Sequence, residues 1–526
     1  MADSHPSPGG TPTAIRRLDE DHAPPVPSPL NPDQSRSRAI PKPVAREQRE
    51  KKDSLKKRES VAGARGATPD VKQNFKAPPA SGPKRVVLPA PEPQAYLAPR
   101  DSIFAPHEPE PIYTPDGSAQ LKRPVDINYN NKNTRTAYCV ADPLFPHMQL
   151  YRQTEVTPFT PHMSVHDSDR NIHFDSSCRT ITNVKGWRMA RANVFAREGS
   201  LYYEVKVVRG IPESSQIGFQ ETEVQPHVRM GWTRREAPLD APVGFDGYSY
   251  GVTDTRFDTM HRSRVGKFLA PKTKNKAKPK TPQTANPDAP MEPIRTGDVI
   301  GMMITLPPLN LHRKVVAGTY NPAVDLYSST PDPDAPPPDI IRDRAPIISR
   351  HTYYLEHSEY QPTKIIKAYG DRAPVNAHRP YFNHEEIPLR SLPHSNIKVY
   401  KNGELVGTAF ENLLAFLPPA SMPTGEHGVR QGFDDGSLGY YPAISVFSGG
   451  IAEANFGPDF WYPPPDLQTQ SQDVEMGNIE PQFPSSSDDA PKPRAISERY
   501  AEQIAEDVVW DIIDEAGFFA QDGGYR

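Results

Sequence analysis

Short runs in which apolar and polar residues alternate recur through residues 164–462. In the clearest run, Leu201, Tyr203, Val205 and Val207 would share one face of a strand. Further β-type runs, some of them more continuously apolar, occupy residues 171–174, 180–184, 228–232, 297–304, 399–406 and 441–447. Repeated short strands separated by glycine, proline and asparagine are typical of two-layer antiparallel proteins. We therefore predict an all-β fold here, an antiparallel β-sandwich in which Trp232 lies in the core.

Turn signals and insertions divide this region further. Asn402 and Gly403 both accept positive φ, so they predict a type I′ hairpin between residues 399–401 and 405–406. Three stretches rich in Pro, Gly or Lys do not fit inside a packed core, and we expect them to be long surface loops. They span residues 267–295, 321–346 and 418–438.

One amphipathic helix is predicted near the C-terminus, over residues 495–517. Ser497 is a suitable N-cap, Glu498 suits the first turn, and Gly517 can end the helix. The opposite face is acidic, so this helix is expected to bind a partner, although packing back onto the sandwich is the alternative. The apolar stripe consists of Ala501, Ile504, Ala505, Val508, Val509, Ile512 and Ala516, widened by Trp510 and Ile513.

Composition predicts disorder outside these elements. The chain has 526 residues with 63 Pro and 33 Gly, and only 36% of its residues are hydrophobic. We expect residues 1–95 to be a disordered arm, 96–163 to pack on the sandwich, 463–494 to be a linker and 518–526 a tail. The arm is basic, which suggests nuclear import or non-specific DNA contact, a plain solvated tail being the alternative. Its densest run contains Arg46, Arg49, Lys51, Lys52, Lys56, Lys57 and Arg58.

The sequence carries no motif for catalysis. It has no Gly-rich phosphate loop, no His-Glu-x-x-His and no Gly-x-Ser-x-Gly, so we expect neither enzymatic activity nor a cofactor. His162 and His166 are four residues apart, but Pro161 and the β context argue against a metal site. The two cysteines, Cys139 and Cys178, fit a reducing compartment, and we expect no membrane span and no secretory signal.

Several segments together resemble the SPRY domain of one family. These are residues 229–232 (Arg-Met-Gly-Trp), 241–250, 297–301, 455–458 and 462–464. They resemble the Ash-two/Bre-two subunit of the COMPASS histone H3 lysine methyltransferase complex, in its fungal form. The predicted terminal helix is similar to the segment with which this subunit binds a Dpy-thirty/Sdc-one dimer.

The resemblance implies a nuclear, non-catalytic scaffold of chromatin regulation. In that family the SPRY surface binds an acidic and hydrophobic segment of a WD-repeat subunit. Together they support methylation of histone H3 at lysine 4 by a SET-domain subunit acting on the nucleosome. The implied contact positions for the WD-repeat subunit are Trp187, Arg229, Pro242, Phe245 and Arg256.

This chain departs from the animal members at two of these positions, and other roles stay open. Trp187 and Phe245 stand where animal members have Tyr, so stacking is kept and a hydroxyl contact is lost. Arg256 is the one candidate for a basic contact further along the chain. Arg229 could instead form a structural ion pair. A SPRY adaptor of a ubiquitin ligase is the alternative function.

Overall fold

The computed structural model describes a defined part of the chain: residues 92–96, 111–124, 134–141, 152–153, 155, 159–212, 224–269, 292–325, 345–349, 352–360, 362–370, 379–422, 434–465, 467 and 491–522. The chain divides into two compact units, Met1–Lys76 and Ala77–Arg526, and the described elements belong to the second. Residues 1–91 of the predicted arm and most of the three insertions lie outside the described residues, whereas residues 93–95, expected to be disordered, belong to a short 3-10 helix. Among those that are described, no helix has the length and hydropathy needed to cross a membrane.

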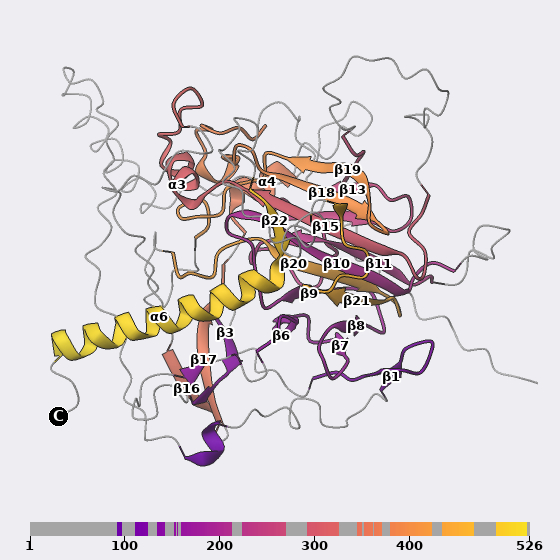
Figure 1. Ribbon diagram of the computed structural model, residues 1–526, viewed down its shortest axis with the longest axis horizontal. Coiled ribbons are helices and arrows are strands. Elements are labelled where there is room, and N and C mark those ends of the chain that lie inside the picture. The colour runs from indigo at the N-terminus through magenta and orange to yellow at the C-terminus, as the bar shows by residue number, and fades with distance from the viewer. Residues whose placement is uncertain are drawn as a thin grey trace, which may run out of the picture. The chain divides into compact units, whose positions relative to one another are not determined.

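Two large β-sheets pack face to face (Figure 1). Their neighbouring strands are antiparallel, except that β22 (Pro493–Ala495) runs parallel to β10. The eight-stranded first sheet has the order β19 (Glu404–Glu411), β18 (Asn396–Lys401), β15 (Val299–Leu306), β10 (Gly199–Arg209), β21 (Ile451–Asn455), β8 (Thr180–Thr182) and β7 (His173–Phe174), with β22 added on β10. The seven-stranded second sheet has the order β14 (Arg264–Gly266), β13 (Thr259–His261), β12 (Ser249–Thr253), β11 (His227–Thr233), β20 (Tyr441–Phe447), β9 (Trp187–Ala192) and β6 (Met163–Ser168).

Smaller elements surround the sandwich. Short strands pair as β1 (Ile112–Tyr113) with β2 (Gln120–Leu121), β4 (Val140–Ala141) with β5 (Arg152–Gln153), and β17 (Thr352–Ser358) with both β16 (Ala345–Ser349) and β3 (Thr134–Tyr138). The helical elements are η2 (Pro93–Tyr96), α3 (Leu309–Ala317), α4 (Lys364–Gly370), η4 (Ile387–Leu389) and α6 (Ile496–Asp522). The predicted antiparallel sandwich with long insertions and a C-terminal helix is confirmed.

The residues that the alternating pattern assigned to the core are buried. Leu201, Tyr203, Val205 and Val207 are all buried between the sheets. Trp232 on β11 is also fully buried, and its ring meets that of Tyr203 edge-on with centroids 5.0 Å apart. Trp232 is therefore a core residue, as predicted.

The Asn-Gly hairpin is confirmed. Asn402 and Gly403 have φ values of 51° and 86° and connect β18 to β19. The side-chain oxygen of Asn402 also accepts the backbone N–H of Val299 at 2.8 Å, which ties the hairpin to the next strand.

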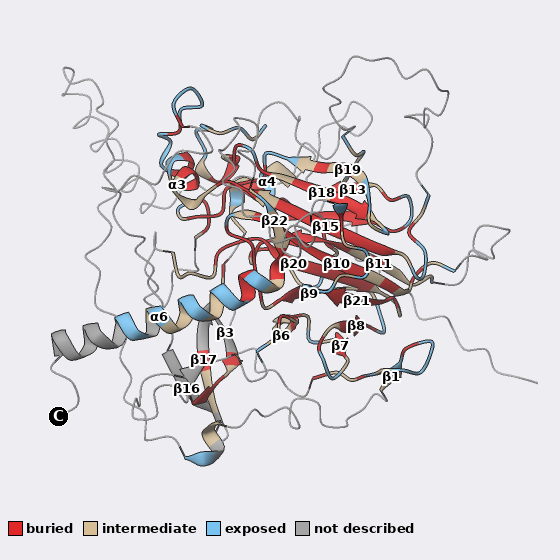
Figure 2. Cartoon of the chain, viewed as in Figure 1, coloured by how far each residue is buried: buried red, intermediate tan, exposed pale blue. Residues whose placement is uncertain are grey.

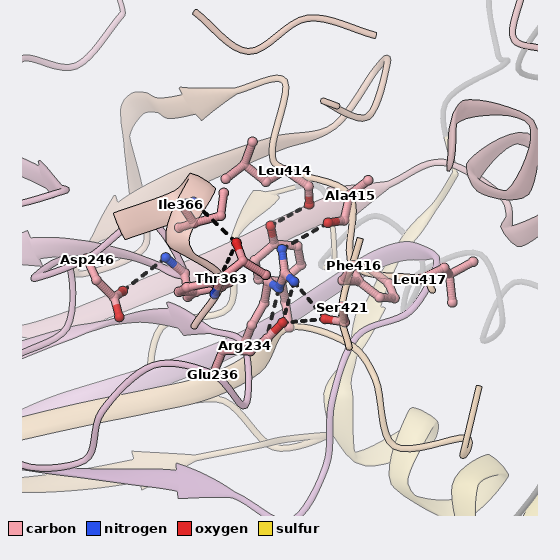
Figure 3. Close-up of polar contacts among 12 residues, drawn as sticks. Arg234, Glu236, Asp246, Thr363, Ile366, Leu414, Ala415, Phe416, Leu417 and Ser421 are labelled. Carbon is pink, nitrogen blue, oxygen red and sulfur yellow. Dashed lines mark hydrogen bonds and ion pairs between the residues drawn. The ribbon is translucent and has the colours of Figure 1, made fainter. Parts of the chain in front are cut away.

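Buried charges hold the loops that cover the outer face of the second sheet. Arg234 follows β11 and is fully buried, with its guanidinium paired to Glu236 (Figure 3). The same guanidinium donates to the carbonyl of Ala415 at 2.9 Å and to the Ser421 hydroxyl at 2.7 Å. Pairing and these hydrogen bonds offset the cost of burying the charges. A distant segment is thereby held against the end of β11.

The ends of the insertions are more ordered than predicted. Ile294 and Ala420 are fully buried, although both fall inside stretches expected to be surface loops. Leu269 forms a β-bridge with Thr408. Helices α3 and α4 were not predicted either; they are short, with nine and seven residues.

The C-terminal helix also differs from the prediction at both ends. It begins at Ile496, so Ser497 lies within the first turn, and its backbone N–H donates to the carbonyl of Phe456. It continues through Gly517 to Asp522. The preceding strand β22 falls partly in the expected linker, and it attaches the helix to the sandwich.

His312 on α3 is a buried acceptor that must stay neutral. Its Nε2 accepts the backbone N–H groups of Phe416 and Leu417 at 3.1 and 3.3 Å. Burial lowers the pKa of His312 well below its ordinary 6.5, and the charges of Arg197 and Arg234 lower it further. A protonated ring would lose this acceptor, so α3 depends on the neutral form.

Stability should therefore fall in mild acid. Because the folded pKa of His312 is depressed, its contribution to stability is present above pH 6.5 and is lost as the pH drops below it. We expect the urea midpoint to be lower at about pH 5.5 than at about pH 7.5. His312→Gln keeps an acceptor that does not titrate, so it should reduce this difference. The exposed His394→Asn serves as the control. An undiminished difference in His312→Gln would contradict the assignment.

Candidate binding face on the second sheet

Strand pairing brings Trp187 and Arg229 together. Phe447 at the end of β20 pairs with Trp187 on β9 and with His227 on β11. Since Val228, Met230 and Trp232 point into the core, the intervening Arg229 must point outward. The Arg229 guanidinium lies 4.6 Å from the centroid of the Trp187 ring, a cation–π contact.

Arg229 is half-buried, and no carboxylate in the described segments forms a salt bridge with it. Burial lowers the pKa of its guanidinium, and Asp254 opposes this from nearby. Asp254 is engaged elsewhere, because it accepts the backbone N–H of Val228 at 2.9 Å and lies 3.1 Å from His227 Nδ1. In the described part of the chain, the buried Nε of Arg229 has no hydrogen-bond partner and the side chain forms no salt bridge. This geometry does not support a structural ion pair and favours an acceptor supplied from outside.

A tight turn, residues 242–245, lies beside Arg229. Its ends are joined by a 3.0 Å hydrogen bond from the N–H of Phe245 to the carbonyl of Pro242. The Ser445 hydroxyl accepts the N–H of Val243 at 3.0 Å, and Ser445 is the register partner of Arg229. Gly244 has φ +85°, and a Cβ there would lie 2.5 Å from the carbonyl oxygen of Met260, so only glycine fits. The Phe245 side chain is left 51% exposed.

The structure thus brings three of the five predicted contact residues, Trp187, Arg229 and Pro242, to one place, with Phe245 at the rim. Arg256 is exposed in the turn after β12, three residues beyond Thr253, the register partner of Arg229. It lies at the same end of the sheet, but the described contacts include none between Arg256 and the other four.

Sequence reasoning missed two aromatic members of this face. The Trp187 ring stacks on His227 with centroids 6.2 Å apart and lies 5.2 Å from Phe447. Both occupy outward positions at strand ends, so their parity relative to Val228 and Val446 could have identified them. Asp254 beneath this face is buried, and its carboxylate accepts the backbone N–H of Val228 near the start of β11.

The helix α6 has two distinct faces (Figure 2). Ile496 and Tyr500 are buried in the sandwich core, and Ile504 packs against it. The Tyr500 hydroxyl donates to Glu155 at 2.9 Å, and Gln503 donates to the carbonyl of Asn193 at 3.0 Å. The first turns of α6 are therefore part of the sandwich, so Ile504 belongs to the docked face and not to a free stripe.

The rest of the predicted stripe is more open. Val509 is 53% exposed, Ala501, Ala505, Ile512 and Ile513 are exposed, and Val508 and Trp510 are half-buried. At 3.6 residues per turn, the stripe from Ala501 to Ile512 lies about 150° around the helix from the docked face. This apolar surface is available to a partner while the other face remains attached.

The structure does not support the other candidate sites to the same extent. The basic run with Arg46 lies outside the described residues. Within the described segments, no group of three or more His, Cys, Asp or Glu side chains is placed to hold a metal ion. His162 bonds through Nδ1 to the carbonyl of Thr160, and Cys139 and Cys178 are buried and not joined in a disulfide.

Comparison with known proteins finds relatives over most of the chain. The COMPASS component cclA of Colletotrichum higginsianum is 43% identical over 99% of this chain and 91% of that protein. The Set1 complex component ash2 of Schizosaccharomyces pombe is 35% identical over 80% of this chain and 51% of that protein. The COMPASS component BRE2 of Saccharomyces cerevisiae is 24% identical over 76% of this chain and 89% of that protein.

Two further comparisons add little. No family model matches the chain. A human SPRY domain aligns over 98% of its length to 55% of this chain, with 12% identity and a TM-score of 0.24. The assignment therefore depends on the sequence relatives, and by the first of them the chain belongs to the family of COMPASS components that includes cclA, ash2 and BRE2.

Proposed function

We propose that this chain is a nuclear, non-catalytic scaffold subunit of a COMPASS-type complex. Its relatives are named as COMPASS and Set1 complex components. Its described surface includes two candidate contact regions, one on the second sheet and one on α6. It would hold a WD-repeat subunit on the second sheet and a Dpy-thirty/Sdc-one dimer on α6. In doing so it would promote methylation of histone H3 at lysine 4 in nucleosomes by the SET-domain subunit.

One observation carries the WD-repeat proposal: Arg229 is stacked on Trp187, and its buried Nε has no hydrogen-bond partner among the described residues. A guanidinium fork matches a carboxylate in two parallel hydrogen bonds, and partial burial strengthens them. Pro242 and Phe245 add apolar area beside it. An acidic residue of the partner would pair with Arg229, and apolar residues beside it would cover Pro242 and Phe245.

The second contact follows from the division of α6 into two faces. The docked face fixes the helix on the sandwich, while Val509, Ile512 and Ile513 are exposed on the later turns. Exposed apolar side chains at helical spacing fit the groove of a helical dimer. The two partners would then be held by one connected scaffold.

Reconstitution tests the proposal as a whole. We expect addition of the full chain to raise methylation of nucleosomal histone H3 at lysine 4 by the SET-domain and WD-repeat subunits. The same reaction without the chain is the control. Unchanged methylation, or affinity purification that returns a cullin in place of these subunits, would contradict the scaffold role.

Arg229→Ala should weaken binding of the WD-repeat subunit about tenfold or more, the effect of a central hot-spot residue. The thermal midpoint should stay nearly unchanged, because the side chain forms no salt bridge within the described residues. Calorimetry with the purified subunit measures the affinity. Arg256→Ala is the comparison: its exposed charge should matter less. Equal affinity of Arg229→Ala and the unchanged chain would remove Arg229 from the site.

Val509→Glu should weaken binding of the helical dimer about tenfold, because it puts a charge on the exposed apolar stripe. Folding stability should not change. Ile504→Ala should lower the free energy of unfolding by about 1–2 kcal/mol through lost packing on the sandwich. Its binding of the dimer should change little. Pull-down with the dimer and urea unfolding distinguish the two. Equal behaviour of both variants would contradict the division of faces.

A further inference from the structure

A second arginine, Arg262, has surroundings like those of Arg229. It lies in the turn between β13 and β14, with its guanidinium 3.4 Å from the centroid of the Tyr369 ring on α4. Its Nε is buried and, within the described chain, has no hydrogen-bond partner. Each arginine is thus pre-oriented on an aromatic ring, and its Nε is left unsatisfied.

The 242–245 turn lies between the two arginines. On one side it is bonded to Ser445, the register partner of Arg229. On the other side, the backbone N–H of Arg262 donates to the carbonyl of Asp246 at 3.0 Å. Ser263 donates from its N–H to Gly244 at 2.9 Å and from its hydroxyl to Phe245 at 2.8 Å. The exposed Phe245 is therefore held between two arginine positions.

Strand register gives the separation of these positions. Met260 on β13 pairs with Gly251, so Arg262 falls level with Ser249, which pairs with Thr233 on β11. Arg262 is thus two strands across from β11 and four residues along from Arg229. With about 4.8 Å between strands and about 3.3 Å per residue, the two Cα atoms are about 16 Å apart. An extended peptide covers this distance in about five residues.

We propose that Arg229 and Arg262 form a two-point clamp for an extended acidic peptide, with an apolar residue on Phe245 between two carboxylates about five residues apart. This deepens the proposed function, because the peptide would be a segment of the WD-repeat subunit. Arg262 extends the binding face beyond the five positions that the family resemblance indicates. The distance between the two arginines would then select peptides by the spacing of their two acidic residues.

Charge and shape both favour an acidic peptide. The exposed charged side chains of α4 are Lys364 and Lys367, and the helix contains no acidic residue. The nearby Asp246 is turned inward, where it accepts the N–H of Tyr248 and the hydroxyl of Ser249. Double-stranded DNA would supply anions, but its phosphate backbone has no apolar group to cover Phe245.

Fluorescence anisotropy on the full chain tests the clamp. The first peptide carries glutamates at its first and sixth positions and leucine between them, with serine and glycine elsewhere. The second has glutamine in place of the sixth glutamate. We expect Arg262→Gln to weaken binding of the first about three- to tenfold and to leave the second unchanged. Tyr369→Leu removes the ring beneath Arg262, so it should also weaken binding of the first peptide.

A matched variant controls for net charge. Arg264→Gln removes an arginine from the same hairpin and should affect both peptides equally and weakly. The clamp is overturned if Arg264→Gln equals Arg262→Gln, if the unchanged chain does not distinguish the peptides, or if a DNA duplex displaces the first peptide at similar concentration. If the WD-repeat subunit binds through Arg229 and is insensitive to Arg262→Gln, only the clamp fails. If it does not bind the unchanged chain, the proposed function fails.

Discussion

Burial of Val228, Met230 and Trp232 between the two sheets is the constraint on which the candidate binding face depends. Side chains of a strand alternate, so the same burial forces Arg229 outward. A slip of one residue would bring the guanidinium into the core and expose Trp232, at a cost of several kcal/mol. The register of β11 is therefore specified by the core, and the position of Arg229 follows from it.

The outer face of the second sheet is covered unevenly, and buried polar contacts decide where. Met189, Val243, Tyr248 and Ile366 belong to a second apolar cluster that covers its middle. Arg191 anchors this covering, since it pairs with Asp167 at 2.7 Å and donates to the carbonyls of Arg234 and Ala237. At the end marked by Trp187 and Phe447 the side chains are only half-buried. A partner segment could complete the covering there.

The C-terminal helix connects its exposed apolar stripe to this frame. Because β22 extends the first sheet and Tyr500 enters the core, the helix starts from a fixed point. Arg499, itself buried, bonds to Glu506 at 2.6 and 2.8 Å and supports the next turns. The candidate binding face and the exposed stripe of α6 belong to one packed unit, so they have a defined relation, which a long flexible linker would not provide.

The periodic patterns by themselves determined the β-sandwich, the Asn402–Gly403 hairpin, the core role of Trp232 and the existence of the C-terminal helix, because each depends on a local spacing. The resemblance of short motifs to a known family added five expected contact positions, which remain a prediction. Only the tertiary structure decided which apolar residues of the helix dock and which stay exposed, since Ile504 and Val509 look alike in sequence. It also decided that His227 and Phe447 lie against Trp187, and that Arg262 stacks on Tyr369. These residues come from strands and turns distant in the chain, and their meeting depends on register and strand order, which no local pattern encodes.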